Sequence, residues 1–190
     1  MHKRFFILTL VVAGALVLLP VCKKPEDGSS VKTKIKASFQ VSGDKGRGGI
    51  MVFELDPAKS PKGVERFVTL AKQGMYDGLL MFHVSKEGLI QSGCPFNDGS
   101  GAAPDNKVIK AELDTTLKTM HGMLVMRAHF ENDPAMISSQ ILLFKNPVLT
   151  EDGKNCFIGM LVQGGPVLDS IHKDDTIISV KITEDTVKMP

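Results

Sequence analysis

The most constraining feature of this sequence is a series of short apolar segments, most of them bounded by glycine, proline, asparagine or aspartate. Segments of this kind, rich in β-branched and aromatic residues, are typical of β-strands. Eight of them occur, at 34–41, 49–55, 79–84, 89–93, 123–126, 139–144, 156–162 and 177–182. Regular strand–helix alternation, which would indicate a parallel sheet, is absent. We therefore expect a mostly β protein, a closed eight-stranded antiparallel barrel.

Two segments predict helices. Ser60 is a suitable N-cap and Pro61 suits a first helical position, and apolar residues then recur at helical spacing until Gly74. A shorter apolar pattern predicts a second helix over residues 165–171. Between the strands, residues 94–107 are rich in Gly, Pro, Asn and Asp, which predicts a long loop.

The charge balance argues against a nucleic-acid partner. The 190 residues carry a formal charge of +2, but residues 1–22 contain Lys3 and Arg4 and no acidic residue. The remaining chain has 21 basic and 21 acidic residues and is neutral. Because phosphate contacts require a basic surface, we expect no nucleic-acid partner. With ten Phe, one Tyr and no Trp, the core should be largely aliphatic.

The first 22 residues resemble a secretory signal. Lys3 and Arg4 precede an uncharged run over residues 5–19, and a polar stretch follows Cys22. The pattern is similar to a bacterial lipoprotein signal, in which the cysteine becomes the lipidated N-terminus, although Val21 stands where Gly, Ala or Ser is usual. We predict a lipoprotein-type signal peptide over 1–22, a linker over 23–33 and a folded domain over 34–190.

Two alternatives to lipidation of Cys22 stay open. The apolar run over 5–21 could remain as an uncleaved membrane anchor, at the short end of what spans a bilayer. It could also be removed as an ordinary secretion signal. All three interpretations place the domain outside the cytoplasm, in the cell envelope. Disulfides are permitted there, so Cys94 and Cys156 could pair or remain as buried free thiols.

Motifs for metal or nucleophilic chemistry are missing. The five histidines lack metal-ligand spacing, and no CxxC, HExxH or GxSxG is present. The glycine-rich stretches at 46–49 and 99–101 are most simply turns or loops. We expect no cofactor and no metal.

In order and spacing, several segments resemble the cyclophilins, the barrel family of peptidyl-prolyl isomerases. The similarity runs from Lys34 to Glu184. It is carried by the hairpin and helix at 49–68, the "GFYDG"-like turn at 74–78, the "MIQGG"-like segment at 89–93, the "DPxSAxSQFF"-like segment at 133–142, the "DGKHxVFG"-like segment at 152–159 and the closing strand at 177–182. The resemblance implies a cyclophilin-like domain that acts on Xaa-Pro segments of polypeptides as a monomer.

The resemblance places His83 at the family's catalytic arginine. Gapless alignment from Tyr76 to Gln91 gives this register, and the alternative with a one-residue deletion also loses the arginine. Gly88, Leu142 and Asn155 stand where the family has an aromatic, a Phe and a His. The substrate-binding residues that the resemblance implies are Leu89, Gln91, Met126, Arg127, Gln140, Leu142 and Asn155.

Loss of the arginine bears on the mechanism. Isomerisation crosses a barrier of about 18–20 kcal/mol without breaking a bond, so the enzyme must stabilise the twisted amide, for example with an N–H donor to the prolyl nitrogen. His83 could be that donor or an inert filler, and Arg127, where the family has a small residue, could reach the site or lie in solvent. With His83 as donor, activity should rise as the pH falls toward 6, and a rate independent of pH would contradict the role.

Three interpretations follow. The first is an envelope isomerase that assists the folding of exported proteins, with activity weakened by loss of the arginine. The second is a non-catalytic module that binds proline-containing segments or a partner protein. The third is an envelope lipoprotein in which the barrel is only a scaffold. Turnover separates the first from the second, and a usable groove separates both from the third.

Overall fold

The computed structural model describes residues 31–128 and 133–188. The signal peptide predicted over 1–22, including Cys22, lies outside the described residues, as does the linker up to residue 30. The linker was predicted to reach residue 33, but β1 (Val31–Ser42) already begins at Val31. Its first residues pair with the end of β10, where Val31 lies opposite Lys188.

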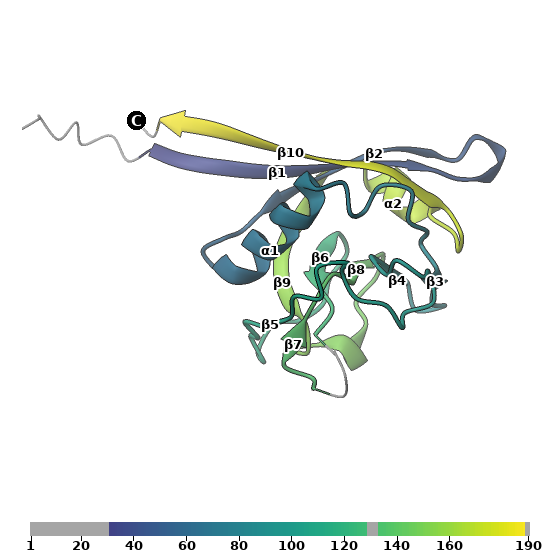
Figure 1. Ribbon diagram of the computed structural model, residues 1–190. Helices are drawn as coiled ribbons and strands as arrows, with labels where there is room; N and C mark the ends of the chain where they lie inside the picture. Colours follow the sequence, from purple (N-terminus) through teal and green to yellow (C-terminus); the bar gives the residue numbers. More distant parts are fainter. Residues whose placement is uncertain (1–30, 129–132, 189–190) are drawn as a thin grey trace, which may run out of the picture.

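The main sheet has eight strands, and every neighbouring pair is antiparallel. Their order is β10-β1-β2-β9-β6-β8-β4-β3. After β1, the bounds are β2 Gly48–Leu55, β3 His83–Val84, β4 Leu89–Ser92, β6 Met123–Met126, β8 Ile141–Phe144, β9 Cys156–Gln163 and β10 Thr176–Lys188. Each strand falls on a predicted segment, which confirms the mostly β class with eight strands. Figure 1 shows β1 and β10 as a long ribbon along one side of the molecule.

The barrel is open and curled, where a closed one was expected. No ladder joins the edge strands β3 and β10. The segment before β3 closes this seam with one isolated bridge, between Leu80 and Thr176. Backbone hydrogen bonds from Met81 N to Asp175 O and from Ile177 N to Leu79 O, both 2.8 Å, extend it. β3 is too short to form more, because it ends at Val84.

Both predicted helices are confirmed, as α1 (Pro61–Lys72) and α2 (Gly165–Ser170). α1 begins at the predicted proline and packs its apolar face against β9 and β10, while α2 lies against β2. The loop over 94–107 is also confirmed, since it contains no helix or strand. Elements without a sequence signal are the short sheet of β5 (Ile109–Lys110) and β7 (Met136–Ile137) and the 3-10 turns η1 (Asp44–Gly46) and η2 (Leu149–Glu151). Within the described residues, no helix has the length and apolar character to cross a membrane.

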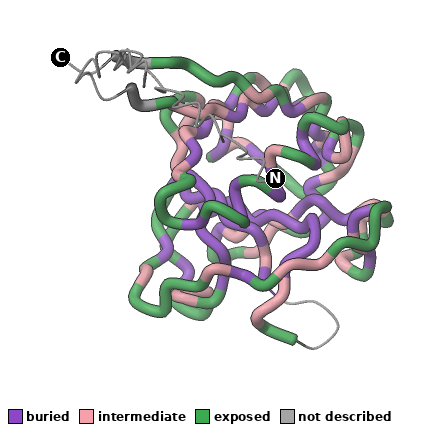
Figure 2. The backbone as a smooth tube through the Cα atoms, turned by 60° about the vertical axis from the view of Figure 1, so that its left-hand side comes forward, coloured by how far each residue is buried: buried purple, intermediate pink, exposed green. Residues whose placement is uncertain are grey.

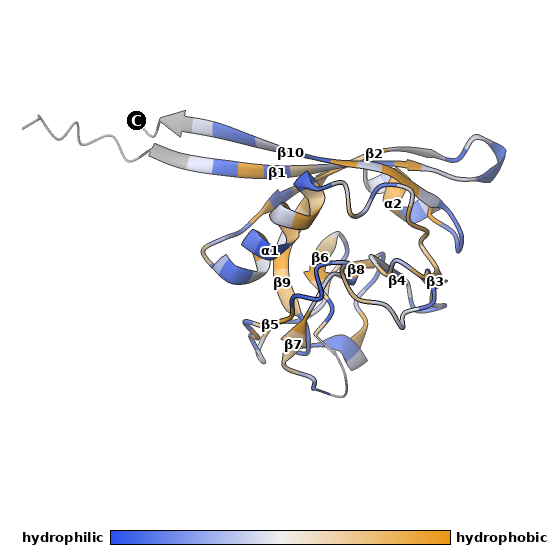
Figure 3. Ribbon diagram, viewed as in Figure 1, coloured by the Kyte–Doolittle hydropathy of each residue, from blue (hydrophilic) through white to orange (hydrophobic). Residues whose placement is uncertain are grey.

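Two apolar clusters lie on opposite faces of the sheet. The larger, inside the curl, includes the contacting rings of Phe39 and Phe53, whose centroids are 5.3 Å apart, among mostly aliphatic side chains. The smaller cluster comprises Met123, Val125, Leu142, Phe144, Val148 and Phe157. Because β6 and β8 contribute to both clusters, every residue of each strand is buried. Figure 2 shows buried and exposed segments alternating along the chain, and Figure 3 shows hydrophobic residues along β9 and β6. Cys94 and Cys156 are buried free thiols, so the alternative of a disulfide between them is not formed.

A buried arginine ties α1 to the long loop. The guanidinium of Arg66 donates to both carboxylate oxygens of Asp105, at 2.6 and 2.8 Å, and to the carbonyl oxygens of Lys107 and Ser138. The hydrogen bonds from Arg66 hold the pKa of Asp105 well below its usual range. This network fixes the loop that supplies two backbone groups to the candidate site.

Candidate active site

Strand register brings the predicted polar residues to one face of the sheet. Directly paired residues share a face, and the pairs His83–Gln91, Gln91–Leu142, Leu142–Val125 and Val125–Phe157 form one row across five strands. Leu142, Val125 and Phe157 belong to the smaller apolar cluster. His83 and Gln91 therefore form the polar edge of that cluster.

Gln140 and Arg127 join this edge from the neighbouring strands. Gln140 lies two residues before Leu142, and Arg127 two residues after Val125, so alternation places both on the same face. Gln91 Nε2 donates to Gln140 Oε1 at 2.7 Å, and Arg127 Nη1 donates to the same oxygen at 3.1 Å. The structure thus brings together three of the predicted residues in one hydrogen-bonded chain.

The long loop completes the hydrogen bonding of Gln140. Its Nε2 donates to the carbonyl oxygens of Gly99 at 2.8 Å and Gly101 at 3.0 Å. Gly99 has φ +86, and a Cβ there would lie 3.4 Å from Phe82 and 3.7 Å from Gln91 Nε2. These glycines were interpreted only as flexible loop. The position of a backbone carbonyl in a site cannot be predicted from the residue type. Glycine spacing was therefore the one available signal for the contacts of Gly99 and Gly101.

His83 is exposed on the edge strand β3, as the cross-strand partner of Gln91. Its ring is therefore accessible, at the end of the row of polar residues that is opposite Arg127. Next to it in sequence, Phe82 is buried, and its ring lies on the Gln91 side, because a Cβ at Gly99 would contact both Phe82 and Gln91 Nε2.

Met126 is not available to a ligand, contrary to the prediction. It lies between Val125 and Arg127, and alternation turns it to the opposite face, where it is fully buried in the larger cluster.

Two further predicted contacts lie mostly below the surface. Leu142 is 1% exposed and is part of the smaller cluster. Asn155, 6% exposed, accepts from the Ala128 backbone N–H at 3.1 Å and donates to Glu151 at 2.8 Å. Asn155 therefore holds two chain segments together. Leu89 is half-buried against the smaller cluster and remains the accessible apolar residue of the predicted set.

Gly88 shows why an aromatic is missing from the groove. It ends the turn between β3 and β4 with φ +98, which disfavours any side chain. A Cβ would lie 2.8 Å from Asn146 Nδ2. The turn itself excludes an aromatic wall here.

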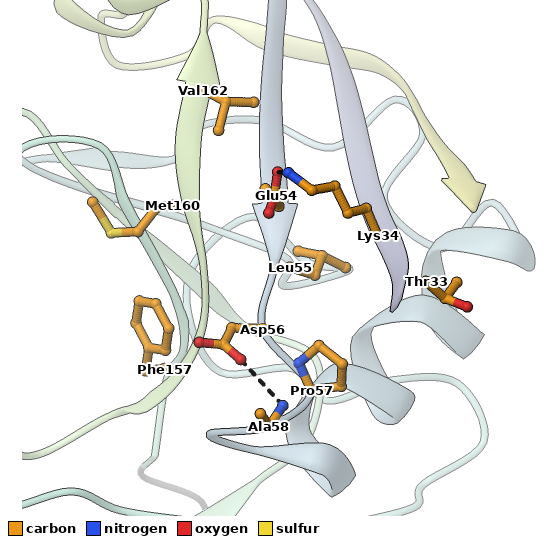
Figure 4. A pocket seen from close by; sticks show the side chains of 10 residues that line it. All are labelled: Thr33, Lys34, Glu54, Leu55, Asp56, Pro57, Ala58, Phe157, Met160 and Val162. Atoms are coloured by element: carbon orange, nitrogen blue, oxygen red, sulfur yellow. Dashed lines mark hydrogen bonds and ion pairs between the residues drawn. The ribbon is translucent and has the colours of Figure 1, made fainter. Parts of the chain in front are cut away.

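Two hollows open near this face. One, of about 350 Å³, is lined by Arg127 and Asn155 together with Leu113, Ala128, Pro134, Glu151, Gly153 and Lys154. The other, of about 360 Å³, lies beside β1, β2 and β9, as Figure 4 shows, and contains none of the predicted site residues. Its wall includes the ion pair of Lys34 with Glu54, at 3.1 Å. Only the first hollow adjoins the glutamine pair, through Arg127.

The described part of the chain holds no cluster of three or more His, Cys, Asp or Glu side chains suited to a metal. The groups that converge at the site are amides, a guanidinium and an imidazole. They can donate hydrogen bonds to a peptide, and they require no covalent step.

The curled eight-stranded sheet with two helices defines the class of protein, a cyclophilin-like fold. A solved cyclophilin type peptidyl-prolyl cis-trans isomerase from Cryptosporidium parvum has a TM-score of 0.68 at 20% identity, over 80% of this chain and 99% of that one. A second structure of that protein, determined in the presence of the dipeptide Ala-Pro, gives a TM-score of 0.65 at 22% identity, over 78% of this chain and 99% of that one.

Sequence relatives agree with the fold. The family model "Cyclophilin type peptidyl-prolyl cis-trans isomerase/CLD" matches residues 38–189. A peptidyl-prolyl cis-trans isomerase of Helicobacter pylori strain J99 is 30% identical over 83% of this chain and 96% of its own length. Peptidyl-prolyl cis-trans isomerase B of Bacillus subtilis is 27% identical over 71% and 92%. The match to cyp15 of Rhizopus delemar, 32% identical over 65% of this chain, spans only 20% of that protein. The chain belongs to the cyclophilin-type peptidyl-prolyl cis-trans isomerase family.

Proposed function

We propose that this chain is a slow peptidyl-prolyl isomerase that acts on Xaa-Pro bonds of exported proteins in the cell envelope, as a monomer without a cofactor. The observation that carries the proposal is the 2.7 Å hydrogen bond between Gln91 and Gln140, beside an exposed His83 on the same sheet face. Gln91 retains a free carbonyl oxygen and one N–H for the backbone of an extended peptide.

The mechanism follows from the loss of conjugation in a twisted amide. When the prolyl peptide bond leaves planarity, its nitrogen lone pair becomes a hydrogen-bond acceptor. A donor fixed near that nitrogen stabilises the twisted form more than either planar form and so lowers the barrier. His83 offers such an N–H at the β3 end of the groove. Because the aromatic walls are replaced by Gly88 and a buried Leu142, we expect weak substrate binding.

Substitution of His83 tests its role as a donor. In a protease-coupled isomerase assay of the full chain, His83→Ala should lower the rate by about tenfold, less than the 10²–10³ typical of a fully enclosed donor, because His83 is exposed.

The matched control for His83→Ala is His121→Ala. It removes another exposed histidine, which pairs with Asp169. This control should keep the wild-type rate. A rate of His83→Ala within twofold of wild type would contradict the donor role of His83.

We also propose that Cys22 carries the lipid that holds the domain in the envelope. The support is the basic, apolar and cysteine-terminated pattern of residues 1–22. Cys22→Ser should abolish incorporation of labelled fatty acid and release the protein from the membrane fraction, whereas Cys94→Ser should change neither. Equal labelling of the Cys22→Ser protein would contradict lipidation, and unlabelled wild-type protein in the membrane fraction would indicate the uncleaved anchor.

The second candidate function is a non-catalytic module that binds proline-containing segments. The substitution of the catalytic arginine by His83 favours it, because peptide binding needs the glutamines but not a donor to the prolyl nitrogen. Peptide binding without any acceleration by the folded wild-type protein would decide for this function.

A further inference from the structure

The amide of Gln140 has no capacity left for a substrate. An amide side chain has two N–H donors and an oxygen with two lone pairs. Both donors are used by the carbonyls of Gly99 and Gly101, and the oxygen accepts from Gln91 and Arg127. At 9% exposure, Gln140 is a junction that orients its neighbours. The groups that meet a peptide must therefore be those neighbours.

Arg127 is held at this junction twice. Its backbone N–H donates to Gln140 O at 2.8 Å, and its Nη1 donates to Gln140 Oε1 at 3.1 Å. A guanidinium has five N–H groups, and the bond to Gln140 is the one side-chain hydrogen bond of Arg127 to the described residues. The side chain is half-buried, where a fixed donor is worth more than it is in water.

A second observation places the guanidinium beside space for a ligand. Arg127 lines the hollow of about 350 Å³, whose wall combines Leu113, Ala128 and Pro134 with the polar side chains of Glu151, Lys154 and Asn155. Hollows of this size accept small ligands, and the apolar part of the wall suits a proline ring. Arg127 therefore lies between the glutamine pair, which can hold a peptide backbone, and a cavity that can hold the ring.

We propose that Arg127 is a catalytic residue, whose guanidinium donates an N–H to the prolyl nitrogen as the amide twists. This inference rests on the proposed isomerase function. No bond forms or breaks in the step. The nitrogen lone pair leaves conjugation, accepts the hydrogen bond from Arg127, and returns to conjugation in the other isomer, while the proton stays on the guanidinium.

The proposal predicts a contribution that does not depend on pH. A guanidinium stays protonated at every relevant pH, so the contribution of Arg127 does not change with pH. Loss of Arg127 should therefore lower kcat by the same factor at pH 6 and at pH 8.5.

The experiment measures kcat and KM of the full chain and of three variants between pH 6 and 8.5. Arg127→Gln should lower kcat at pH 8 on the order of 10²-fold, with KM within threefold of wild type. Arg127→Lys should recover part of this loss, because it keeps the charge but not the planar fork. The matched control, Lys86→Gln, removes an exposed cation in the β3–β4 turn and should keep the wild-type values.

A kcat of Arg127→Gln within twofold of wild type would overturn the proposal, and so would a loss confined to KM. An NMR readout separates this result from failure of the proposed function. If the wild type shows no acceleration, the proposed isomerase function fails. In that case the NMR signal of the Arg127 Nε–H is followed while an Ala-Pro peptide is added. A shift of that signal would support contact of Arg127 with the prolyl segment, and an unmoved signal would overturn this inference as well.

Discussion

Replacing Arg66 with alanine should lower the free energy of unfolding by about 3 kcal/mol. The side chain of Arg66 is 3% exposed, and its guanidinium satisfies the carboxylate of Asp105 and the carbonyl oxygens of Lys107 and Ser138. Alanine leaves all three acceptors without this donor. We place the effect at the lower end of the range for buried pairs because the side chain of Asp105 is 40% exposed and water can reach it. Urea denaturation at pH 7 measures the change.

The same network predicts an acid-sensitive part of the stability. Hydrogen bonds from Arg66 lower the folded pKa of Asp105, so its contribution is fully present above the unfolded value of about 3.9 and is lost as the pH falls below it. Because Arg66→Ala removes the cause of the lowered pKa, unfolding of the variant should depend less on pH between 5 and 2.5.

The control for Arg66 is the neighbouring Glu65→Ala. Glu65 is exposed on the same helix, so the change should stay within about 0.5 kcal/mol of wild type. A loss below 1 kcal/mol in Arg66→Ala would contradict the role of the network in holding the long loop. So would a free energy of unfolding that depends on pH between 5 and 2.5 to the same extent in Arg66→Ala and wild type.

Gln140→Ala should lower kcat/KM for a prolyl peptide on the order of 10²–10³-fold. Alanine removes the shared acceptor of Gln91 and Arg127 and both bonds to the loop carbonyls of Gly99 and Gly101. The two donors would then adopt several conformations, and their preorganisation would be lost. The isomerase assay at pH 8 measures the effect, with thermal unfolding followed in parallel to show that the variant is folded.

Gln40→Ala is the matched control for this change. Gln40 is an exposed glutamine on β1, away from the groove, and its removal should leave kcat/KM unchanged. A folded Gln140→Ala protein with kcat/KM within threefold of wild type would contradict the account of Gln140 as the junction of the site.

The strands could be predicted from sequence because their burial follows a local pattern. Each segment bounded by turn residues formed a strand, and α1 begins at Pro61 as expected, although the Ser60 hydroxyl donates to the carbonyl oxygen of Phe157 and makes no capping hydrogen bond. Closure of the barrel could not be predicted in this way. It depends on how far β3 extends, and that strand ends at Val84, so the seam is made by Leu80 and its neighbours instead.

The polar site was predictable in its members but not in their roles. Family spacing located Gln91, Gln140 and Arg127, and all three meet. The prediction of Met126 as a binding residue was wrong because its side chain lies on the opposite face of β6. A strand that is buried on both faces gives no sequence signal of which face a residue occupies. The sequence also could not show that Gln140 uses all of its hydrogen-bonding capacity, because two of its four partners are backbone carbonyls.

In the proposed mechanism, the positive charge comes from Arg127 at the end of β6 rather than from a residue on β3, and Gln91 and Gln140 connect the two positions. Slow catalysis with a pH-independent component is the behaviour that distinguishes this arrangement from a purely histidine-based one.

The central claim, that this groove isomerises prolyl bonds, is tested most directly by exchange NMR of a short Xaa-Pro peptide with a small fraction of the full-length protein. Uncatalysed exchange takes tens to hundreds of seconds, so cis and trans signals show no exchange cross peaks by themselves on the NMR mixing timescale. The account predicts cross peaks when the wild-type protein is added and their loss with Gln140→Ala. Peptide signals without cross peaks, in the presence of folded wild-type protein, would contradict it.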